Sequence, residues 1–448
     1  MRIPVIVIVP AQEPIRESAA AFFEGRPPLM SLTQARIPDQ LQIDANTPAV
    51  PIGTGHLDNI TIASMDPAQS QNFAVRATVN VDSVENVPET IGDRQVFADP
   101  RIDHFATCAG TPSVGNAATV AGKLNLSALT TGSRGLDGSN VAVAIMDTGI
   151  NLAYLTGKVP AARLDVGNSL TLPGATTLPG KYPLDHGTMC AYDVLLAAPN
   201  ATLLDFPILA SSAPGGAVVG RTLSVAMTAF SQLFTNWGVA FAPGGVSKYA
   251  GLVVNNSWGI FHPSWDFPPG HRGRYIDNPR HPFNLLVTAM AGSGIDLVFA
   301  AGNCGPICPD MRCLGRSTGA IMGANAHRDV LTVAGCDTTD AIVGYSSQGP
   351  SIAGMTPQKP DLTGYTHFLG SEAFGPGTPD TGTSAACPVV AGCLAALRTK
   401  IAFSATPPTS LFSQLNATAR TVPPQTAWQV DFGHGIIDPD AAAKSLGV

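Results

Sequence analysis

The larger part of the chain, from about residue 113 to residue 448, alternates short apolar runs with longer helical stretches. The run from Val141 to Met146 is uninterrupted, and similar runs cover residues 251–256, 295–301 and 330–335. Glycine-bounded apolar runs that alternate with helices predict an α/β fold with a parallel sheet flanked by helices. Functional groups in such sheets collect at the carboxyl ends of the strands, so the polar residues that follow these runs are candidates for chemistry.

Residues 1–112 follow another pattern, in which apolar strands and polar turns alternate without a strong catalytic motif. Residues 72–81 alternate with a period near two, residues 94–102 form a second strand, and residues 82–91 between them favour a short helix. The apolar run in residues 1–10 is short and has no small-residue cleavage site close behind it, so we interpret it as a buried strand and not as a signal peptide. This region is predicted to be a small α/β unit joined by a linker to the larger domain, which spans residues 113–448.

Composition and charge exclude several classes of protein. Apolar residues make up 45% of the 448 residues and charged residues only 13%, with 46 Gly and 38 Pro, which is typical of a compact, loop-rich globular protein and not of a disordered one. The net charge is −7 and no dense run of Lys and Arg occurs, so nucleic acid is not expected as a partner. No segment reaches the roughly 18 apolar residues of a membrane helix, so no membrane partner is expected either. The cellular location stays unknown.

Six of the eight cysteines fall into two groups. Three lie in apolar helical patterns and are predicted to be buried thiols: Cys190, Cys387 and Cys393. Three others lie close together in one loop: Cys304, Cys308 and Cys313. A disulfide between two of the loop cysteines is expected, because a zinc site would need a fourth ligand and another spacing.

Three polar residues have the surroundings that nucleophilic catalysis needs, namely a hydroxyl, a base and an acid that orients the base. Ser384 precedes the apolar run of residues 389–397 and so opens a helix, where unpaired N–H groups and the helix dipole favour negative charge. His186 also opens an apolar stretch, and Asp147 follows the first strand. The Asp-Thr-Gly triplet at residues 147–149 is weak by itself, since it also occurs in aspartic proteases.

Four motifs together resemble the subtilases, the subtilisin-like serine proteases of the peptidase S8 family. They stand in the family's order, as Val-Ala-Ile-Met-Asp-Thr-Gly-Ile at 143–150, His-Gly-Thr at 186–188, Ala-Ala-Gly-Asn at 300–303 and Gly-Thr-Ser at 382–384. The similarity extends over about residues 115–445. It implies a serine endopeptidase that hydrolyses peptide bonds through an acyl-enzyme.

The resemblance also implies a role for each site residue. Ser384 would attack the scissile carbonyl, His186 would accept its proton, and Asp147 would fix the imidazole tautomer. Asn303 matches the family's oxyanion asparagine, which acts together with the backbone N–H of the nucleophile. No cofactor is required for this chemistry, and no catalytic metal is expected.

The resemblance places the substrate between two short segments. Ser257, Trp258 and Gly259 match the family's edge strand, which pairs with an extended polypeptide. The segment Ala300, Ala301 and Gly302 would form the opposite wall of the primary pocket. Small residues on the walls leave room for a large apolar side chain before the cleaved bond, and neither segment contains an acidic residue to select Lys or Arg. Trp258 departs from the small or aliphatic residue that is usual in the family.

Residues 260–284 form an insertion rich in Pro, His and aromatic residues directly after the edge strand. Its aromatic side chains either narrow the substrate groove or pack as a surface loop: Trp265, Phe267, Tyr275 and Phe283. His271 is a second candidate for the border of the cleft. Structural calcium is a further expectation from the family, with oxygen ligands offered by Asp266, Asp277 and Asn278.

The N-terminal region resembles a subtilase propeptide at the strand of residues 96–99, which precedes a linker. If this holds, residues near 104–112 pass through the active site and are cut there, and the N-terminal region acts as an intramolecular inhibitor. The alternative is a permanent accessory domain.

Two other readings of the whole chain compete with an active peptidase. Sedolisins share the serine motif but use Glu and Asp in place of His, so the His-Gly-Thr motif at 186–188 argues against them. A non-catalytic binding protein on the same fold is the second alternative, because fold alone does not establish function. Such proteins usually lack a triad or oxyanion residue, and here all four are present.

Overall fold

The computed structural model describes most of the chain. The described residues are 1–26, 30–53, 60–61, 63–105, 107, 112–131, 134–171, 175–210, 221–241 and 248–448. No helix within these residues combines the length and the apolar composition needed to cross a membrane.

A seven-stranded parallel sheet forms the centre of the larger domain, with the strand order β15-β14-β13-β11-β8-β10-β9. Its strands are β8 (Val141–Met146), β9 (Arg163–Leu164), β10 (Thr202–Phe206), β11 (Gly251–Asn256), β13 (Asp296–Ala300), β14 (Leu331–Cys336) and β15 (Leu362–Tyr365). All of its pairings are parallel. The α/β fold and the four strands predicted from the apolar runs are confirmed, with boundaries that differ by one residue at most.

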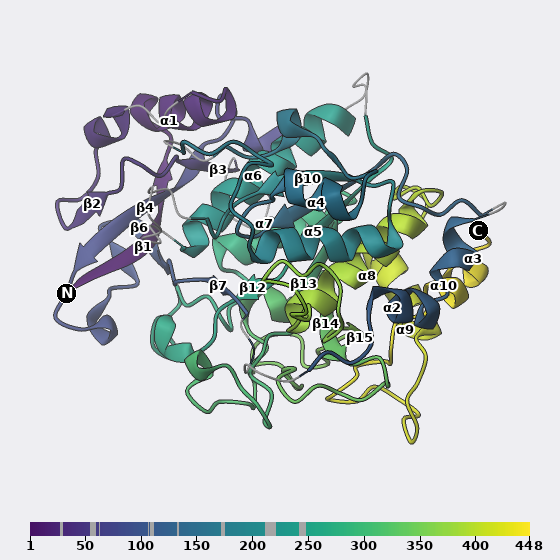
Figure 1. The fold of residues 1–448 in the computed structure, drawn as a ribbon. Coiled ribbons are helices and arrows are strands. Elements are labelled where there is room, and N and C mark those ends of the chain that lie inside the picture. The colour runs from purple at the N-terminus through teal and green to yellow at the C-terminus, as the bar shows by residue number, and fades with distance from the viewer. Residues whose placement is uncertain are drawn as a thin grey trace.

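Helices cover both faces of this sheet (Figure 1). The helices of this domain are α2 (Ala117–Lys123), α3 (Leu126–Thr130), α4 (Leu152–Lys158), α5 (His186–Ala197), α6 (Leu223–Phe241), α7 (Pro282–Gly292), α8 (Thr383–Arg398), α9 (Pro408–Thr418) and α10 (Pro439–Ser445). Alternate residues of a strand point to opposite faces. Val141 and Val143 of β8 therefore share a core with α5 and α8, whereas Ala142 and Ala144 share one with α6 and α7.

The N-terminal region forms a separate antiparallel sheet with the order β2-β4-β1-β6-β5, and β3 also pairs with β4. Its elements are β1 (Arg2–Pro10), α1 (Glu13–Phe23), β2 (Leu41–Ile43), β3 (Val50–Gly53), β4 (Asn72–Asn80), β5 (Thr90–Ile91) and β6 (Arg94–Ala98). The strands predicted near residues 1–10, 72–81 and 94–102 are confirmed. The helix predicted over residues 82–91 is wrong, since the chain there makes one 3-10 turn (Val84–Asn86) and then enters β5.

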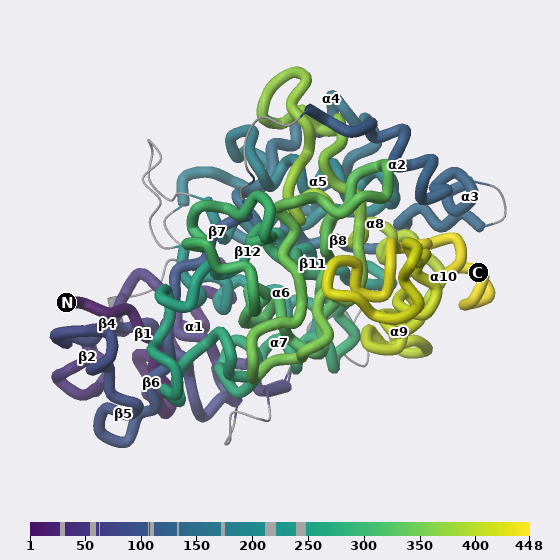
Figure 2. Tube along the Cα trace, turned by 90° about the horizontal axis from the view of Figure 1, so that it is seen from below, coloured from purple at the N-terminus to yellow at the C-terminus, as the bar shows by residue number. Residues whose placement is uncertain are grey.

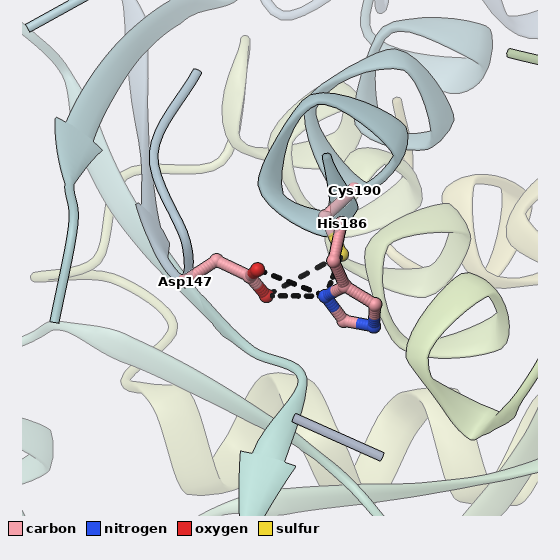
Figure 3. A group of neighbouring side chains, drawn as sticks. All are labelled: Asp147, His186 and Cys190. Atoms are coloured by element: carbon pink, nitrogen blue, oxygen red, sulfur yellow. Dashed lines mark hydrogen bonds and ion pairs between the residues drawn. The ribbon is translucent and has the colours of Figure 1, made fainter. Parts of the chain in front are cut away.

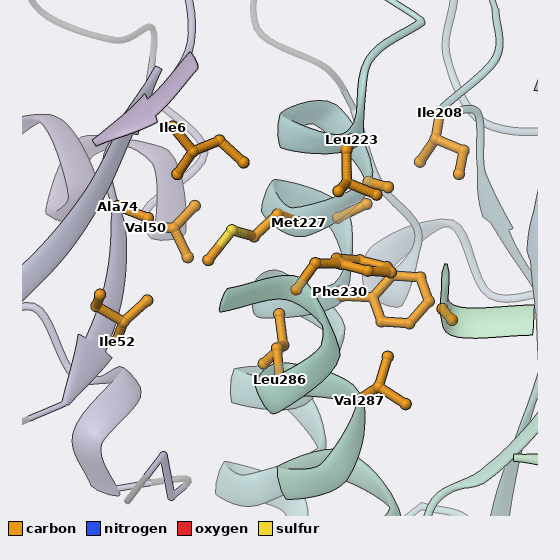
Figure 4. Packing of buried hydrophobic residues seen from close by; sticks show 14 of the residues in the cluster. Ile6, Val50, Ile52, Ala74, Ile208, Leu223, Met227, Phe230, Leu286 and Val287 are labelled. Atoms are coloured by element: carbon orange, nitrogen blue, oxygen red, sulfur yellow. The ribbon is translucent and has the colours of Figure 1, made fainter. Parts of the chain in front are cut away.

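One face of the N-terminal sheet packs on α6 and α7 (Figure 4). The side chains that meet there come from β1, β3 and β4 on one side and from the two helices on the other: Ile6, Val50, Ile52, Ala74, Leu223, Met227, Phe230, Leu286 and Val287. The N-terminal region therefore lies beside these helices, at the opposite side of the molecule from the C-terminal helices α9 and α10 (Figure 2).

The insertion at 260–284 packs against the body of the protein. Phe267, Tyr275 and Phe283 are buried in the core, and Trp265 is half-buried beneath the guanidinium of Arg101. Of the two alternatives for these aromatic residues, packing therefore holds for the three buried ones. His271 also lies away from the cleft border, because its Nε2 contacts the carbonyl oxygen of Val87 in the N-terminal region.

The cysteine predictions are confirmed. Cys304 and Cys313 form a disulfide, which closes the loop that follows β13. Cys190, Cys387 and Cys393 are buried free thiols.

Candidate active site

Four residues predicted for catalysis lie at the same edge of the parallel sheet. Asp147 directly follows β8, and Asn303 follows β13 by three residues. His186 is the first residue of α5, and Ser384 is the second residue of α8. Parallel strands end at a common edge, so positions far apart in the sequence meet there.

Asp147 and His186 are in direct contact (Figure 3). The Nδ1 atom of His186 lies 2.8 Å from Oδ1 and 3.0 Å from Oδ2 of the carboxylate. Asp147 is fully buried and also accepts a hydrogen bond from the backbone N–H of Thr148 at 2.7 Å. This geometry fixes the imidazole with Nε2 as the nitrogen that faces away from the acid.

The pKa values of this pair move in opposite directions. Burial alone would raise the pKa of Asp147, but the charge of His186 and the hydrogen bonds from His186 and Thr148 lower it below its usual value. Burial alone would lower the pKa of His186, but the charge of Asp147 and its hydrogen bond raise it above its usual value. The pair therefore favours a charged acid and a basic imidazole.

Cys190 lies one helical turn beyond His186, with its Sγ 3.6 Å from Oδ2 of Asp147 (Figure 3). Within the described residues, Asp147, His186 and Cys190 are the one group of three such side chains close enough to share a metal ion. Burial raises the pKa of the Cys190 thiol well above its usual value, so it stays protonated, and the Nδ1–carboxylate contact is a hydrogen bond. The group therefore fits a metal poorly.

Ser384 lies at the N-terminus of α8 and is fully buried. Its Oγ is 3.4 Å from the carbonyl oxygen of Ser257 and 3.5 Å from that of Phe105. The Nε2 atom of His186 is buried and has no hydrogen-bond partner among the described residues. Ser384 and His186 are thus on the same edge, but no hydrogen bond joins them in this state.

Asn303 is held by the turn before Ser384. Its Oδ1 accepts hydrogen bonds from the backbone N–H of Thr383 at 2.9 Å and from the Thr383 hydroxyl at 3.0 Å. The amide nitrogen points toward Gly382, since a Cβ added to that glycine would lie 2.8 Å from it. Gly382 has a φ of +81°, a conformation that glycine adopts readily. The amide donor of Asn303 is therefore close to the backbone that carries the serine.

The two predicted walls of the primary pocket are tied together by a residue that the sequence did not indicate. Asn325 is buried, and its Nδ2 lies 2.9 Å from the carbonyl oxygens of both Trp258 and Ala300. Ala301 and Gly302 continue the second wall, where Ala301 donates its N–H to Val333 in the sheet. One side-chain amide thus joins the two walls.

The first wall contributes its backbone, and the side chain of Trp258 points away from the cleft. The indole is fully buried and contacts Phe230, Phe283 and Phe299. Its unusual size is therefore explained by the core beneath the strand. The hydroxyl of Ser257 donates to the carbonyl oxygen of Ser384 at 3.1 Å and joins this wall to α8.

A segment of the N-terminal region lies along this wall. The strand β7 (Asp103–His104) pairs antiparallel with β12 (Trp258–Gly259), so that His104 faces Trp258 and Asp103 faces Gly259. The ring of Phe105 lies between the walls, because a Cβ on Gly259 would be 2.7 Å from it and one on Gly302 would be 3.2 Å from it. The ring of His104 covers that of His186, with 4.7 Å between the centroids.

The sequence predicted that residues near 104–112 pass through the active site. Of these, residues 106 and 108–111 lie outside the described residues. It did not identify Phe105 as the side chain in the pocket, nor Asn325 as the link between the walls. No local motif marks either residue, since both act through contacts with segments that are distant in the sequence, 25 and 67 residues away for Asn325.

The three residues offered for calcium have protein partners. Asp266 accepts hydrogen bonds from the backbone N–H groups of Phe267, Tyr275 and Ile276. Asp277 forms an ion pair with Arg274, and the side-chain amide of Asn278 donates to the carbonyl oxygen of Arg272. Calcium binding by Asp266, Asp277 and Asn278 stays a prediction.

Comparison with known proteins gives a match to one family model, described as the subtilase family, over residues 138–435. Two similar solved structures are MycP1 from the ESX-1 type VII secretion system and MycP1 from Mycobacterium smegmatis. The first is 21% identical and has a TM-score of 0.48, with 77% of this chain and 90% of the other covered. The second is 20% identical and has a TM-score of 0.48, with coverages of 81% and 94%. No curated protein sequence matches this chain.

The family match spans about two thirds of the chain and includes all four residues of the candidate site. The chain is therefore a member of the subtilase family and a serine-type endopeptidase.

Proposed function

We propose that this protein cleaves polypeptides through an acyl-enzyme formed on Ser384, with His186 as base and Asp147 as its orienting acid. The observation that supports this most is the segment 103–105, which lies in the cleft as a substrate would. Its Phe105 carbonyl oxygen is 3.5 Å from Oγ of Ser384 at the end of an antiparallel pairing with the edge strand. The carbonyl group of Phe105 therefore lies beside the hydroxyl that would attack its carbon atom.

In the proposed first step, Oγ of Ser384 attacks the substrate carbonyl carbon while Nε2 of His186 accepts the hydroxyl proton. Asp147 stabilises the imidazolium that forms, through the contact of 2.8 Å to Nδ1. His186 then returns the proton to the leaving amine, and water attacks the acyl-enzyme in the same manner. Oγ of Ser384 would reach Nε2 by rotation of the serine side chain, and Nε2 has no other partner among the described residues.

Negative charge develops on the carbonyl oxygen during both steps. We assign its stabilisation to the side-chain amide of Asn303 and the backbone N–H of Ser384. The hydrogen bonds between Oδ1 of Asn303 and Thr383 orient the amide, and its nitrogen lies beside Gly382, two residues before the serine. The N-terminus of α8 adds a favourable dipole. These steps use only side chains and backbone of this chain, so no cofactor is needed for them.

The N-terminal region, about residues 1–112, is proposed to be a propeptide that first inhibits the catalytic domain of residues 113–448 and is then cut. Its packing on α6 and α7 and the position of His104 over His186 support inhibition. The contact between Ser384 and Phe105 supports cleavage on the carboxyl side of Phe105. The Phe105 ring in the pocket also supports the predicted preference for a large apolar residue before the cleaved bond.

A fluorophosphonate probe tests the proposed nucleophile. Intact mass spectrometry should find one adduct on the purified protein, and peptide mapping should place it on Ser384. The His186→Ala variant should label at least about 10³-fold more slowly, because the hydroxyl is not activated without its base. Labelling of His186→Ala at the wild-type rate, or an adduct on another serine, would contradict the proposal.

A further inference from the structure

The acidic side chain of Asp103 is held in a pocket of positive charge. Asp103 is only 3% exposed. Its Oδ1 pairs with Arg221, and its Oδ2 lies 3.0 Å from Nη1 of Arg312 and 2.8 Å from Nη2 of Arg101 in its own segment. Burial alone would raise the pKa of Asp103, but a hydrogen bond with His104 and the charges of Arg221, His104 and Arg312 hold it well below the usual value.

The position of Asp103 in the cleft is fixed by the backbone. Asp103 faces Gly259 in the antiparallel pairing, and Phe105, two residues later, occupies the primary pocket. On the other side, the backbone N–H of Ile102 donates to the carbonyl oxygen of Arg221 at 2.8 Å. A polypeptide bound in the same register would place its third residue before the cleaved bond where Asp103 lies now.

Both arginines belong to the catalytic domain. Arg221 lies two residues before α6, and Arg312 lies in the loop closed by the Cys304–Cys313 disulfide. They would therefore stay in place after loss of the N-terminal region and meet the next substrate.

The two arginines are held differently. The guanidinium of Arg312 is oriented by hydrogen bonds to Asp310 at 2.6 and 3.0 Å and lies 3.8 Å above the ring of Phe261. Arg221 is 14% exposed, and its Nε has no hydrogen-bond partner among the described residues. An acidic substrate side chain completes the pairing of Arg221, whereas a neutral one leaves a largely buried cation without its acid.

We infer that Arg221 and Arg312 form a subsite for an acidic side chain at the third position before the cleaved bond. This enzyme therefore selects polypeptides in which Asp precedes a large apolar residue by two positions and cleavage follows that residue. The inference rests on the proposed function, since it requires that substrates bind in the register of segment 103–105.

Peptide hydrolysis tests the subsite, with protein that is produced as the full-length chain and used once its self-cleavage is complete. The peptide Arg-Ile-Asp-His-Phe-Ala-Thr, which copies residues 101–107, is compared with peptides that contain Asn or Lys in place of Asp. A hydrogen bond to a charged group is lost on the change to Asn, so kcat/KM should fall about tenfold or more. The Lys peptide should be cleaved more slowly than the Asn peptide.

Variants of the arginines show whether they cause the difference. Arg221→Gln and Arg312→Gln should each bring the ratio of kcat/KM for the Asp and Asn peptides close to one, by slowing cleavage of the Asp peptide. Arg328→Gln is the matched control, since Arg328 is 76% exposed and pairs with Asp329. It should keep the wild-type ratio. The ratio of the two kcat/KM values does not change if a variant merely contains less active protein, so a changed ratio reports the subsite.

Self-cleavage gives a second measurement that needs no added peptide. The full-length Asp103→Asn chain should lose its N-terminal region about tenfold more slowly than wild type, and Asp103→Lys combined with Arg312→Glu should be faster than Asp103→Lys alone. Equal cleavage of the Asp and Asn peptides would overturn the subsite and leave the proposed function standing. Absence of cleavage of every peptide and of the chain itself would overturn both.

Discussion

The two sheets of the molecule differ in what covers their faces. The parallel sheet has helices of its own domain on both faces, α5 and α8 on one and α6 and α7 on the other. The N-terminal sheet has one face on α6 and α7, which belong to the other domain (Figure 4). Ile6 points to those helices, and its neighbours Val5 and Val7 point to the opposite face.

This difference indicates that the parallel-sheet domain carries the catalytic groups and that the N-terminal region supplies a segment that binds as a substrate. The groups proposed for catalysis all belong to the domain that covers its own core, so the site does not depend on the N-terminal sheet for any reacting atom. The N-terminal region depends on the catalytic domain for part of its core, and its segment 103–105 lies where a polypeptide would be cut. We therefore expect changes in the catalytic domain to slow the chemical step. Changes in the N-terminal region should affect only the binding of its segment 103–105 as a substrate.

The largest effect is expected for Asn303. Replacement by Ala removes the amide donor, and kcat should fall about 10²–10³-fold with little change in KM, a magnitude known for the corresponding donor of subtilisin. Steady-state hydrolysis of the heptapeptide measures this. Thr383→Val is an informative companion, because it removes the hydroxyl bonded to Oδ1 of Asn303 but leaves the amide, so its loss should be smaller. Wild-type kcat in Asn303→Ala would remove this residue from the site.

Variants of Phe105 test the role of the N-terminal region as a substrate. Phe105→Ala empties the primary pocket in the full-length chain, and self-cleavage after residue 105 should slow about 10–100-fold as the apolar contact is lost. Phe105→Leu, which keeps a large apolar side chain, should retain most of the rate. Fluorophosphonate labelling of Ser384 in the chain that is still uncut should be no slower in either variant than in wild type, because the catalytic groups are untouched and the cleft is no more covered than before. If labelling of the uncut chain falls together with the cleavage rate, the catalytic groups depend on the N-terminal region and this assignment of roles is wrong.

A variant of Gly259 tests whether Phe105 occupies the primary pocket. A Cβ at this position would lie 2.7 Å from the Phe105 ring and 3.1 Å from the side chain of Asn325, which is fixed by two hydrogen bonds. Gly259→Ala should therefore lower the preference for Phe over Ala before the cleaved bond by about tenfold. Gly292→Ala in α7 is the control, since a Cβ there meets nothing within 4 Å. An unchanged preference in Gly259→Ala would mean that Phe105 does not mark the primary pocket.

The smallest effect is expected for pH. The base must be neutral to accept the serine proton, and the pKa of His186 is raised by Asp147 above its ordinary value of about 6.5. The acid limb of kcat/KM should therefore have its midpoint above pH 6.5, with activity increasing as pH rises through it. Asp103 is also among the charges that raise this pKa. Self-cleavage of Asp103→Asn should thus have a slightly lower midpoint than that of wild type, and an identical or higher midpoint would argue against this contact.

Much of the scaffold could be predicted from local patterns. The strands of the parallel sheet are continuous apolar runs because both of their faces are buried, as in β8. The residues proposed for catalysis follow such strands or open helices, so short motifs with Asp147, His186, Asn303 and Ser384 indicated them. The helix predicted over residues 82–91 failed, because Ser83 forms no side-chain cap and the chain pairs with β6 instead.

The content of the cleft could not be predicted in the same way. Asp103 and Phe105 lie in a polar linker, and their roles come from pairing with residues that are about 150 positions later in the chain. Arg221 and Arg312 meet at Asp103 only after the whole domain has folded. Contacts of this range leave no periodic signal in a single sequence.

Intact mass spectrometry of the freshly purified full-length chain, followed over time, tests most directly whether Ser384 cuts the chain after Phe105. Wild type should convert to a species that begins at Ala106, as peptide sequencing should show, and Ser384→Ala should stay at full length. A Ser384→Ala chain that is cut at the same bond and at the same rate would contradict the account, as would a wild-type chain that labels with fluorophosphonate but is cut at another bond.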